Sequence, residues 1–153
     1  MTHPVGRTRR HLALAVLVAS ALFSSGVATA PAHAGTGLRG QMLQLTNDHR
    51  ADHDRAPLEL DLQLSRYAKR HSQDMADGGE IFHSDDLAAK LKGKDWSAGG
   101  ENVGVGTSLT DLEAAFMAST PHRRNILDGD FDHVAIGVVE SDGDLWVTVI
   151  FYG

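Results

Sequence analysis

Apolar side chains recur every third or fourth residue in two stretches of the first half of the chain, which is the spacing of a buried helix face. The first stretch predicts an amphipathic helix over residues 37–52, with Leu38 and Met42 on its inner face. The second begins after Asp61, a favoured N-cap residue, and ends at Gly78-Gly79, where glycine permits the turn that closes many helices. The inner face of this second helix is formed by Leu64, Ala68, His71 and Met75.

Three polar residues of these two helices are assigned structural roles. Asn47 and Arg50 lie off the apolar face of the first helix. Because most side-chain hydrogen bonds serve the backbone or water, we expect both to bond to loop carbonyls rather than to a ligand. His71 lies within the apolar stripe of the second helix, so it is interpreted as a core residue and not as part of a site.

Shorter patterns fill the second half of the chain. A short helix is predicted from about Asp85 to Leu91, with Ser84 or Asp85 as its cap. A second helix is predicted from a cap at Thr110 to about Ser119, with Leu112, Ala115 and Phe116 on its inner face. A third follows Pro121 and extends from His122 to Leu127. Strands are predicted at residues 101–106, 134–139 and 145–152, the last two joined by a turn at 141–144. These two are apolar on both faces, which implies helices on both sides of the sheet. The expected fold class is α+β, a three-layer α-β-α sandwich with a small, mainly antiparallel central sheet.

Residues 1–34 are typical of a secretion signal. Three arginines precede an apolar run from Leu12 to Phe23, and Ala32-His33-Ala34 then provides a cleavage site. We expect cleavage before Gly35, which leaves residues 35–153 as a single domain outside the cell or in its envelope. The apolar run is too short and too interrupted by serine for a membrane span, which needs about 20 apolar residues. No integral membrane span is therefore expected after cleavage. The chain also has no cysteine for a disulfide or a lipid anchor.

The charge of the chain limits its partners. The full chain has a net charge of −6, and the predicted leader carries three arginines and no acid, so the exported chain would carry −9. Nucleic acids and anionic lipid surfaces reward clustered Lys and Arg, so a protein this acidic is not expected to bind either of them. We expect a monomer.

Residues with acid–base or metal-binding chemistry stand at loops and element starts. They are two imidazoles, His83 and His122, and carboxylates at Glu101, Asp111 and Glu113. Neutral imidazoles with carboxylate oxygens suit a divalent metal such as Zn²⁺. The spacing contains no short ligand motif, so these groups form a site only if the fold gathers them.

Together these segments resemble the CAP superfamily (cysteine-rich secretory, antigen 5, pathogenesis-related 1), in its cysteine-free bacterial form. The resemblance covers nearly all of the chain after about residue 38. It is carried by His83, Gly100-Glu101-Asn102, the acidic start of the third long helix and the run Ser119 to Leu127, with Asn47-x-x-Arg50-Ala51, Pro57-Leu58, Leu64, Ala68 and Asp74-Met75-Ala76 upstream.

The resemblance implies an α-β-α sandwich and a metal-binding tetrad at a central cavity. Matched residue by residue, the tetrad falls on His83, Glu101, Asp111 and His122, counting back to Asp111 from Phe116, which takes the place of the family's usual tryptophan. Aspartate is one methylene shorter than the family's glutamate. Glu113 lies about 200° further around the helix and is expected to face elsewhere. The candidates for the cavity wall or lid are Trp96, Asn102, Glu113 and Phe116.

We interpret the chain as a secreted binding module rather than an enzyme. The resemblance implies divalent metals, small apolar ligands such as lipids or sterols, and cell-wall components as partners. Two alternatives stay open. The four polar groups could form a hydrogen-bonded network that ties loops together without any ligand. The chain could also be a metal-dependent hydrolase of peptides or cell wall, although a nucleophilic mechanism is disfavoured because cysteine is absent and Ser84 and Ser119 are better used as helix caps.

Overall fold

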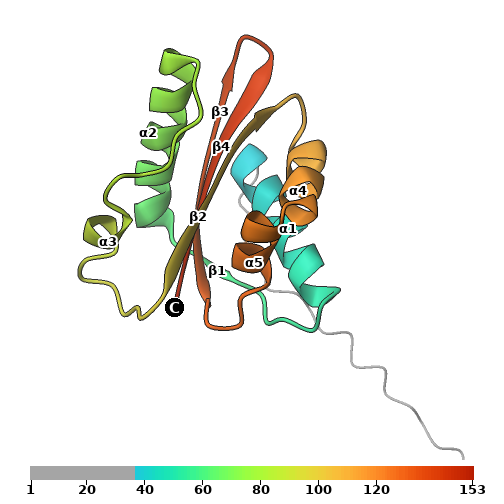
Figure 1. Ribbon diagram of the computed structural model, residues 1–153, viewed down its shortest axis with the longest axis vertical. Coiled ribbons are helices and arrows are strands. Elements are labelled where there is room, and N and C mark those ends of the chain that lie inside the picture. Colours follow the sequence, from blue (N-terminus) through green and yellow to red (C-terminus); the bar gives the residue numbers. More distant parts are fainter. Residues whose placement is uncertain (1–36) are drawn as a thin grey trace, which may run out of the picture. The chain divides into compact units, whose positions relative to one another are not determined.

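Helices cover both faces of a central sheet, so the predicted three-layer sandwich is confirmed (Figure 1). The computed structural model describes residues 37–153; the predicted secretion signal and its cleavage site lie outside the described residues. The elements in chain order are α1 Leu38–Ala51, β1 Glu59–Leu60, α2 Leu62–Gly78, α3 Leu87–Lys90, β2 Gly99–Gly106, α4 Leu109–Ala118, α5 Thr120–Leu127, β3 His133–Ser141 and β4 Asp144–Tyr152. Helices α2 and α3 cover one face, and α1, α4 and α5 cover the other (Figure 1).

The sheet is mainly antiparallel, as the sequence predicts. Its strand order is β1-β3-β4-β2, in which β4 pairs antiparallel with both β2 and β3, and the two residues of β1 pair parallel with the start of β3. A tight turn joins β3 to β4 through Asp142 and Gly143, whose φ angles are 53° and 85°. Two successive positive φ angles are the mark of the hairpin turn that fits the twist of antiparallel strands.

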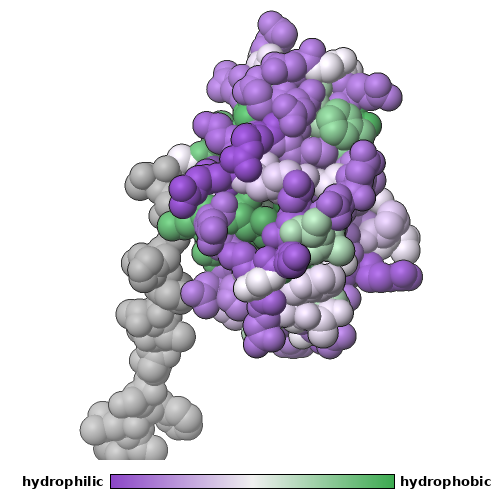
Figure 2. All heavy atoms as spheres, turned by 90° about the vertical axis from the view of Figure 1, so that its left-hand side faces the viewer, coloured by the Kyte–Doolittle hydropathy of each residue, from purple (hydrophilic) through white to green (hydrophobic). Residues whose placement is uncertain are grey.

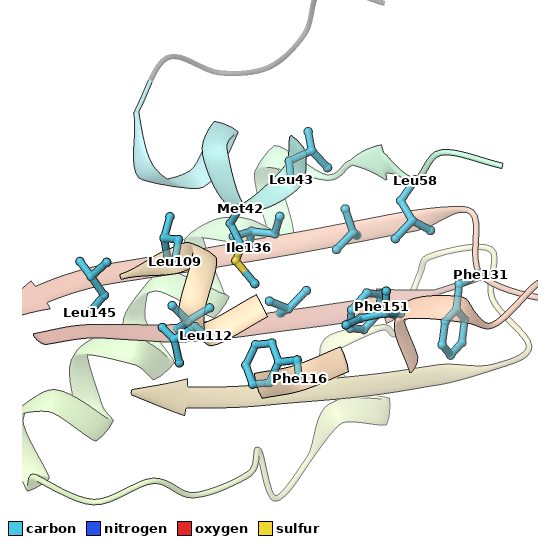
Figure 3. Close-up of a cluster of buried hydrophobic side chains, with 14 residues drawn as sticks. Met42, Leu43, Leu58, Leu109, Leu112, Phe116, Phe131, Ile136, Leu145 and Phe151 are labelled. Carbon is cyan, nitrogen blue, oxygen red and sulfur yellow. The ribbon is translucent and has the colours of Figure 1, made fainter. Parts of the chain in front are cut away.

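Each face of the sheet has its own apolar cluster. The larger cluster lies between the sheet and α1, α4 and α5, and includes Met42, Leu112, Phe116 and Phe151 (Figure 3). The smaller one lies under α2 and includes Leu64, Ala68 and Ile150, with Leu91 packed beside them. Helix α2 approaches the sheet so closely that a Cβ on Gly137 would lie 2.2 Å from the carbonyl carbon of Ala68, so this position of β3 requires glycine.

The polar residues of α1 and the cap of α2 behave as predicted. Arg50 is 1% exposed, and its guanidinium donates to four carbonyls, those of Ala56 at 2.7 Å, Ile126 and Asp128 at 2.8 Å, and Phe131 at 3.0 Å. It thereby ties α1 to the segment between α5 and β3. Asn47 exchanges two hydrogen bonds with the backbone of Leu58. The Asp61 carboxylate caps α2 by accepting from the N–H groups of Gln63 and Leu64.

The predicted caps of two later helices are wrong. Helix α3 is capped by Asp86, not by Ser84 or Asp85. Helix α4 is capped by Ser108, not by Thr110: the Ser108 hydroxyl accepts from the N–H of Asp111 and donates to the Asp111 carboxylate. No helix among residues 37–153 has the length and apolarity that crossing a membrane requires.

Candidate functional site

The site is built around Glu101 on β2. Side chains alternate between the two faces of this strand: a Cβ on Gly100 would touch Asn125 of α5, and one on Gly104 would touch Phe116 of α4. The Glu101 side chain therefore points to the opposite face of the sheet, toward the loop that follows α2. Its backbone lies in the part of β2 whose other face is covered by α5. Its side chain is only 5% exposed.

Three donors from the loop hold the Glu101 carboxylate. Oε1 accepts the Ser84 N–H at 2.8 Å and lies 2.9 Å from His83 Nδ1, and Oε2 accepts the Ser84 hydroxyl at 2.5 Å. The hydroxyl of Tyr67 on α2 donates in turn to Ser84 Oγ at 2.9 Å. This role of Ser84 differs from the helix cap that the sequence predicts. Its hydroxyl is used to fix a carboxylate and not to cap a helix.

This arrangement fixes the tautomer of His83. Because a carboxylate oxygen is an acceptor, Nδ1 carries the proton that the hydrogen bond needs, and Nε2 keeps its lone pair. The His83 side chain is 60% exposed, whereas the Glu101 side chain that orients it is buried. A buried carboxylate thus presents an exposed imidazole with a free nitrogen.

His122 lies near this pair. It stands in the first turn of α5, after Pro121, and its ring meets the ring of Phe116 edge-on at 5.1 Å between centroids. Partial burial lowers the pKa of His122, and the positive charge that His83 carries when it is protonated lowers it further. A lowered pKa keeps this imidazole neutral at neutral pH, with a lone pair available to a ligand.

A chain of amides fixes α5 against β2. Asn102 is fully buried and donates to the backbone oxygen of His122 at 3.1 Å. The Asn125 amide donates to Asn102 Oδ1 at 2.8 Å and to the Glu101 backbone oxygen at 3.2 Å. The two asparagines therefore set the distance between Glu101 and His122. Asn102 was expected as a wall residue, while Asn125 was not singled out, although it belongs to the same run as His122.

The two acids of α4 are placed opposite to expectation. Asp111 is exposed, and its carboxylate is engaged in the cap at Ser108, so the structure does not bring it to His83, Glu101 and His122. Glu113 is the acid that points inward; it is 1% exposed, and both of its oxygens lack a hydrogen-bond partner, as does Thr46 Oγ nearby. Burial raises the pKa of Glu113 to about 7, and the Thr46 hydroxyl beside it lowers that pKa only in part.

Helix α4 is rotated relative to the prediction. Leu109, Leu112, Glu113 and Phe116 are its buried residues, whereas Ala115, expected inside, is exposed. Glu113 is three residues before Phe116 and shares its face. Phe116 itself belongs to the larger apolar cluster as well as contacting His122. Trp96, the remaining wall candidate, is 37% exposed in the loop before β2.

The side chains at this site do not make up the ligand set of a resident metal ion. Within the described part of the chain, no three His, Asp or Glu side chains are grouped so that they could hold one metal ion. Both oxygens of Glu101 are already hydrogen-bonded, and Asp111 lies outside the group. Because a zinc site needs three or four protein ligands, the residues present do not fit a resident Zn²⁺; they offer two imidazoles.

A shallow groove adjoins His83. It has a volume of about 210 Å³ and lies between α2 and the loop that leads to α3. One wall carries the aromatic side chains of Tyr67 and Phe82, and Phe82 is 43% exposed. Polar groups also line the groove, at Asp85, Asp86 and Lys90, and the Lys90 ammonium lies 4.8 Å from the centre of the Tyr67 ring. His71, a buried residue as predicted, closes the groove from below and binds the Phe82 carbonyl through Nε2 at 3.0 Å.

A three-layer α-β-α domain is the fold of the secreted proteins that the sequence resembles. Residues 43–151 match the model of the CAP family, described as the cysteine-rich secretory protein family, and the chain belongs to this family. It is 34% identical over 113 residues to the uncharacterized protein YkwD of Bacillus subtilis, an alignment that covers 69% of this chain and 44% of YkwD.

Solved structures agree with this assignment. An extracellular protein of Bacillus anthracis that contains an SCP domain is 29% identical, with a TM-score of 0.59 over 73% of this chain and 39% of that protein. A cysteine-rich secretory protein of Staphylococcus aureus has the same fold at 23% identity, with a TM-score of 0.62 over 73% of this chain and 36% of that protein. The chain thus spans less than half the length of these relatives.

Proposed function

We propose that the chain is an extracellular binding module whose ligand contacts the two imidazoles of His83 and His122. The observation that carries the proposal is the use of Glu101: both of its oxygens are occupied in fixing His83 and Ser84, which leaves His83 with an oriented and exposed imidazole, close enough to His122 for its charge to affect the pKa of His122. A network that served only to tie loops together would not need an imidazole that is 60% exposed.

Export from the cell is part of this proposal. The predicted leader supports it, as does membership of a family described as secretory. The related Bacillus anthracis protein is called extracellular. A cell-envelope location makes cell-wall material the most abundant ligand within reach.

The groove supports a polar ligand of modest size over a lipid or a sterol. A lipid tail requires an enclosed apolar cavity. This groove of about 210 Å³ is open, and its lining includes the carboxylates of Asp85 and Asp86 and the ammonium group of Lys90. The exposed ring of Phe82 would pack against a sugar ring or an apolar side chain, whereas the Tyr67 ring is already stacked on His71 and covered by the Lys90 ammonium. We therefore propose a short cell-wall glycan or peptide as the ligand, lying along the groove with one polar group at His83.

Divalent metal binding is proposed only in a weaker form than the sequence predicts. Two imidazoles could hold an exchangeable Zn²⁺ whose other positions are taken by water or by the ligand. Zinc binding that is restricted to the folded state would raise the stability by roughly 2.7 kcal/mol at a hundredfold excess over Kd. Because coordination requires neutral imidazole, this gain would fall below about pH 6.

Calorimetric and NMR titrations test the proposal. The exported chain, residues 35–153, is titrated with peptidoglycan fragments and separately with Zn²⁺, and the same titrations are run on His83→Ala and His122→Ala. We expect each substitution to weaken both interactions at least tenfold while the protein stays folded. The matched control is His133→Gln, because His133 is also paired with a carboxylate, that of Asp132, but has no second imidazole beside it. Unaltered affinity in both alanine variants, or no binding of either probe by the parent, would reject the proposed site.

Hydrolysis is the second candidate function, and the Glu101–His83 hydrogen bond favours it. A carboxylate that holds Nδ1–H leaves Nε2 as a general base for water, which is the arrangement of base and orienting group in many hydrolases. Ser84 would not be the nucleophile, because its hydroxyl donates to Glu101. Turnover of peptidoglycan or peptide substrates by the chelated protein, and its loss in His83→Ala, would establish this activity; binding without turnover would exclude it.

A further inference from the structure

A second groove, separate from the candidate site, gathers four cationic side chains. It has a volume of about 380 Å³ and is lined by Arg39 of α1 and by Arg66, Lys69, Arg70 and Gln73 of α2. The groove shares no residue with the groove at His83. It lies on the α2 side of the domain, whose surface is predominantly hydrophilic (Figure 2).

The local geometry explains why these residues meet. Positions 66, 69, 70 and 73 fall on one face of α2 and span about 10 Å along its axis. Arg39 reaches this face across the edge of the sheet, because β1 pairs only with His133 and Val134 and leaves the following part of β3 uncovered. Its Nε donates to the exposed edge carbonyl of Ile136 at 3.1 Å, which anchors the guanidinium at the groove.

The positive charges in this groove have no acidic partner. Among residues 37–153, none of the four cations forms an ion pair with a carboxylate. Asp77, one helical turn after Gln73 and outside the residues that line the groove, accepts from the Gln73 amide at 2.8 Å. Like charges three and four residues apart on a helix repel one another. Four of the 11 Lys and Arg residues after residue 34 are nevertheless concentrated here, on a chain with a net charge of −6.

We propose that this groove binds a phosphate-bearing anionic polymer as a single extended chain. Three guanidinium groups offer paired N–H donors that match the oxygens of phosphate, and an anion would relieve their mutual repulsion. The shape and the overall charge favour a chain over a membrane. A linear polymer can enter the groove alone, whereas a flat anionic bilayer would also approach the acidic surface around it and be repelled.

The experiment compares three phosphate probes and two matched double variants. Binding of tripolyphosphate, of longer inorganic polyphosphate and of phosphatidylglycerol vesicles to residues 35–153 is measured by calorimetry and by co-sedimentation. Arg66→Gln with Arg70→Gln removes two charges from the groove, and Arg123→Gln with Arg124→Gln removes two exposed charges from α5. Denaturant unfolding establishes that both double variants are folded, and His83→Ala separates this groove from the site proposed above.

The groove variant should lose about tenfold or more in affinity for polyphosphate, and the slope of log Kd against log salt should fall by about two. The α5 variant and His83→Ala should bind polyphosphate within about twofold of the parent. Longer polyphosphate should bind more tightly than tripolyphosphate, because it occupies the whole groove. Equal losses in the two double variants, tighter binding to vesicles than to polyphosphate, or full competition by an equal concentration of sulfate would each overturn the proposal.

Discussion

Glu113 offers a sharp test of the packing on the α4 side of the sheet. It is a buried carboxylic acid whose two oxygens have no hydrogen-bond partner within the geometric limits among residues 37–153, although the Thr46 hydroxyl is close enough to lower its pKa. Replacement by Gln keeps the shape of the side chain and removes the charge. The substitution should therefore stabilise the protein at alkaline pH and have little effect in acid.

The magnitude follows from the shift in pKa. Burial raises the pKa of Glu113 from 4.5 to about 7. A raised carboxyl pKa means that the folded state binds the proton more tightly than the unfolded state, so the stability is fully present below pH 4.5 and declines as the pH rises through about 7. Each pKa unit corresponds to 1.36 kcal/mol, so the parent should lose roughly 3 kcal/mol relative to Glu113→Gln between pH 4.5 and pH 8.

Urea unfolding of both proteins at half-unit steps from pH 4.5 to pH 8.5 measures this difference. Other titrating groups are common to the two proteins, so they cancel when the free energies of unfolding are subtracted. Glu80→Gln, at an exposed carboxylate, is the control and should show no such trend. Thr46→Val removes the one group that lowers the pKa of Glu113, so it should move the decline to higher pH. A difference between parent and Glu113→Gln that is flat across this range would refute the burial of an unpartnered acid.

Two further substitutions test polar contacts that position the elements. Arg50→Lys should lower the free energy of unfolding by roughly 2–4 kcal/mol, because an ammonium group cannot reach all four carbonyls that the guanidinium satisfies. Arg124→Lys, at an exposed position, is the control. Equal urea midpoints for the two variants would contradict this role of Arg50. For Asp61, burial alone would raise the pKa, but hydrogen bonds from Lys94, the Leu64 N–H and Tyr152 lower it from 3.8 to about 2. Asp61→Asn should therefore lower the free energy of unfolding by about 2 kcal/mol above pH 4, and this difference from the parent should vanish as the pH falls through 2. An equal loss of stability at pH 2 and pH 7 would show that the negative charge of Asp61 is not the stabilising feature.

The parts of the fold that depend on local pattern were predictable. Helical spacing located α1 and α2, Asp61 and Gly79 mark the ends of α2, and the alternation of apolar residues located the β3–β4 hairpin. The cap of α4 was missed although its signal is present, because Ser108-x-x-Asp111 is itself a capping pattern that competes with Thr110. The same pattern indicates that Asp111 faces the helix end rather than the interior.

The candidate site was predictable only in part. His83 and Glu101 are in contact and Asp111 lies elsewhere, and the roles of Ser84 and Asn125 depend on contacts across 17 to 24 residues. Local sequence cannot distinguish a serine that caps a helix from one that binds a distant carboxylate, since both uses satisfy the hydroxyl. The rotation of α4 could have been found: Glu113 is four residues after Leu109 and three before Phe116, so helical spacing places it on the same inner face.

The net charge of the chain is too coarse a guide to its anionic partners. A net charge averages over the whole surface, whereas the field that a ligand meets is set by the side chains within about 10 Å of it, the screening length at moderate salt. Positions 66, 69 and 70 already stand on one helical face in the sequence, but the fourth charge comes from Arg39, 27 residues earlier, and only the short length of β1 lets it reach α2. The acidic surface therefore disfavours broad anionic partners such as a bilayer, while the groove admits an anionic polymer that is narrow enough to enter it. An overall negative charge and a local site for an anionic polymer are thus compatible in one protein.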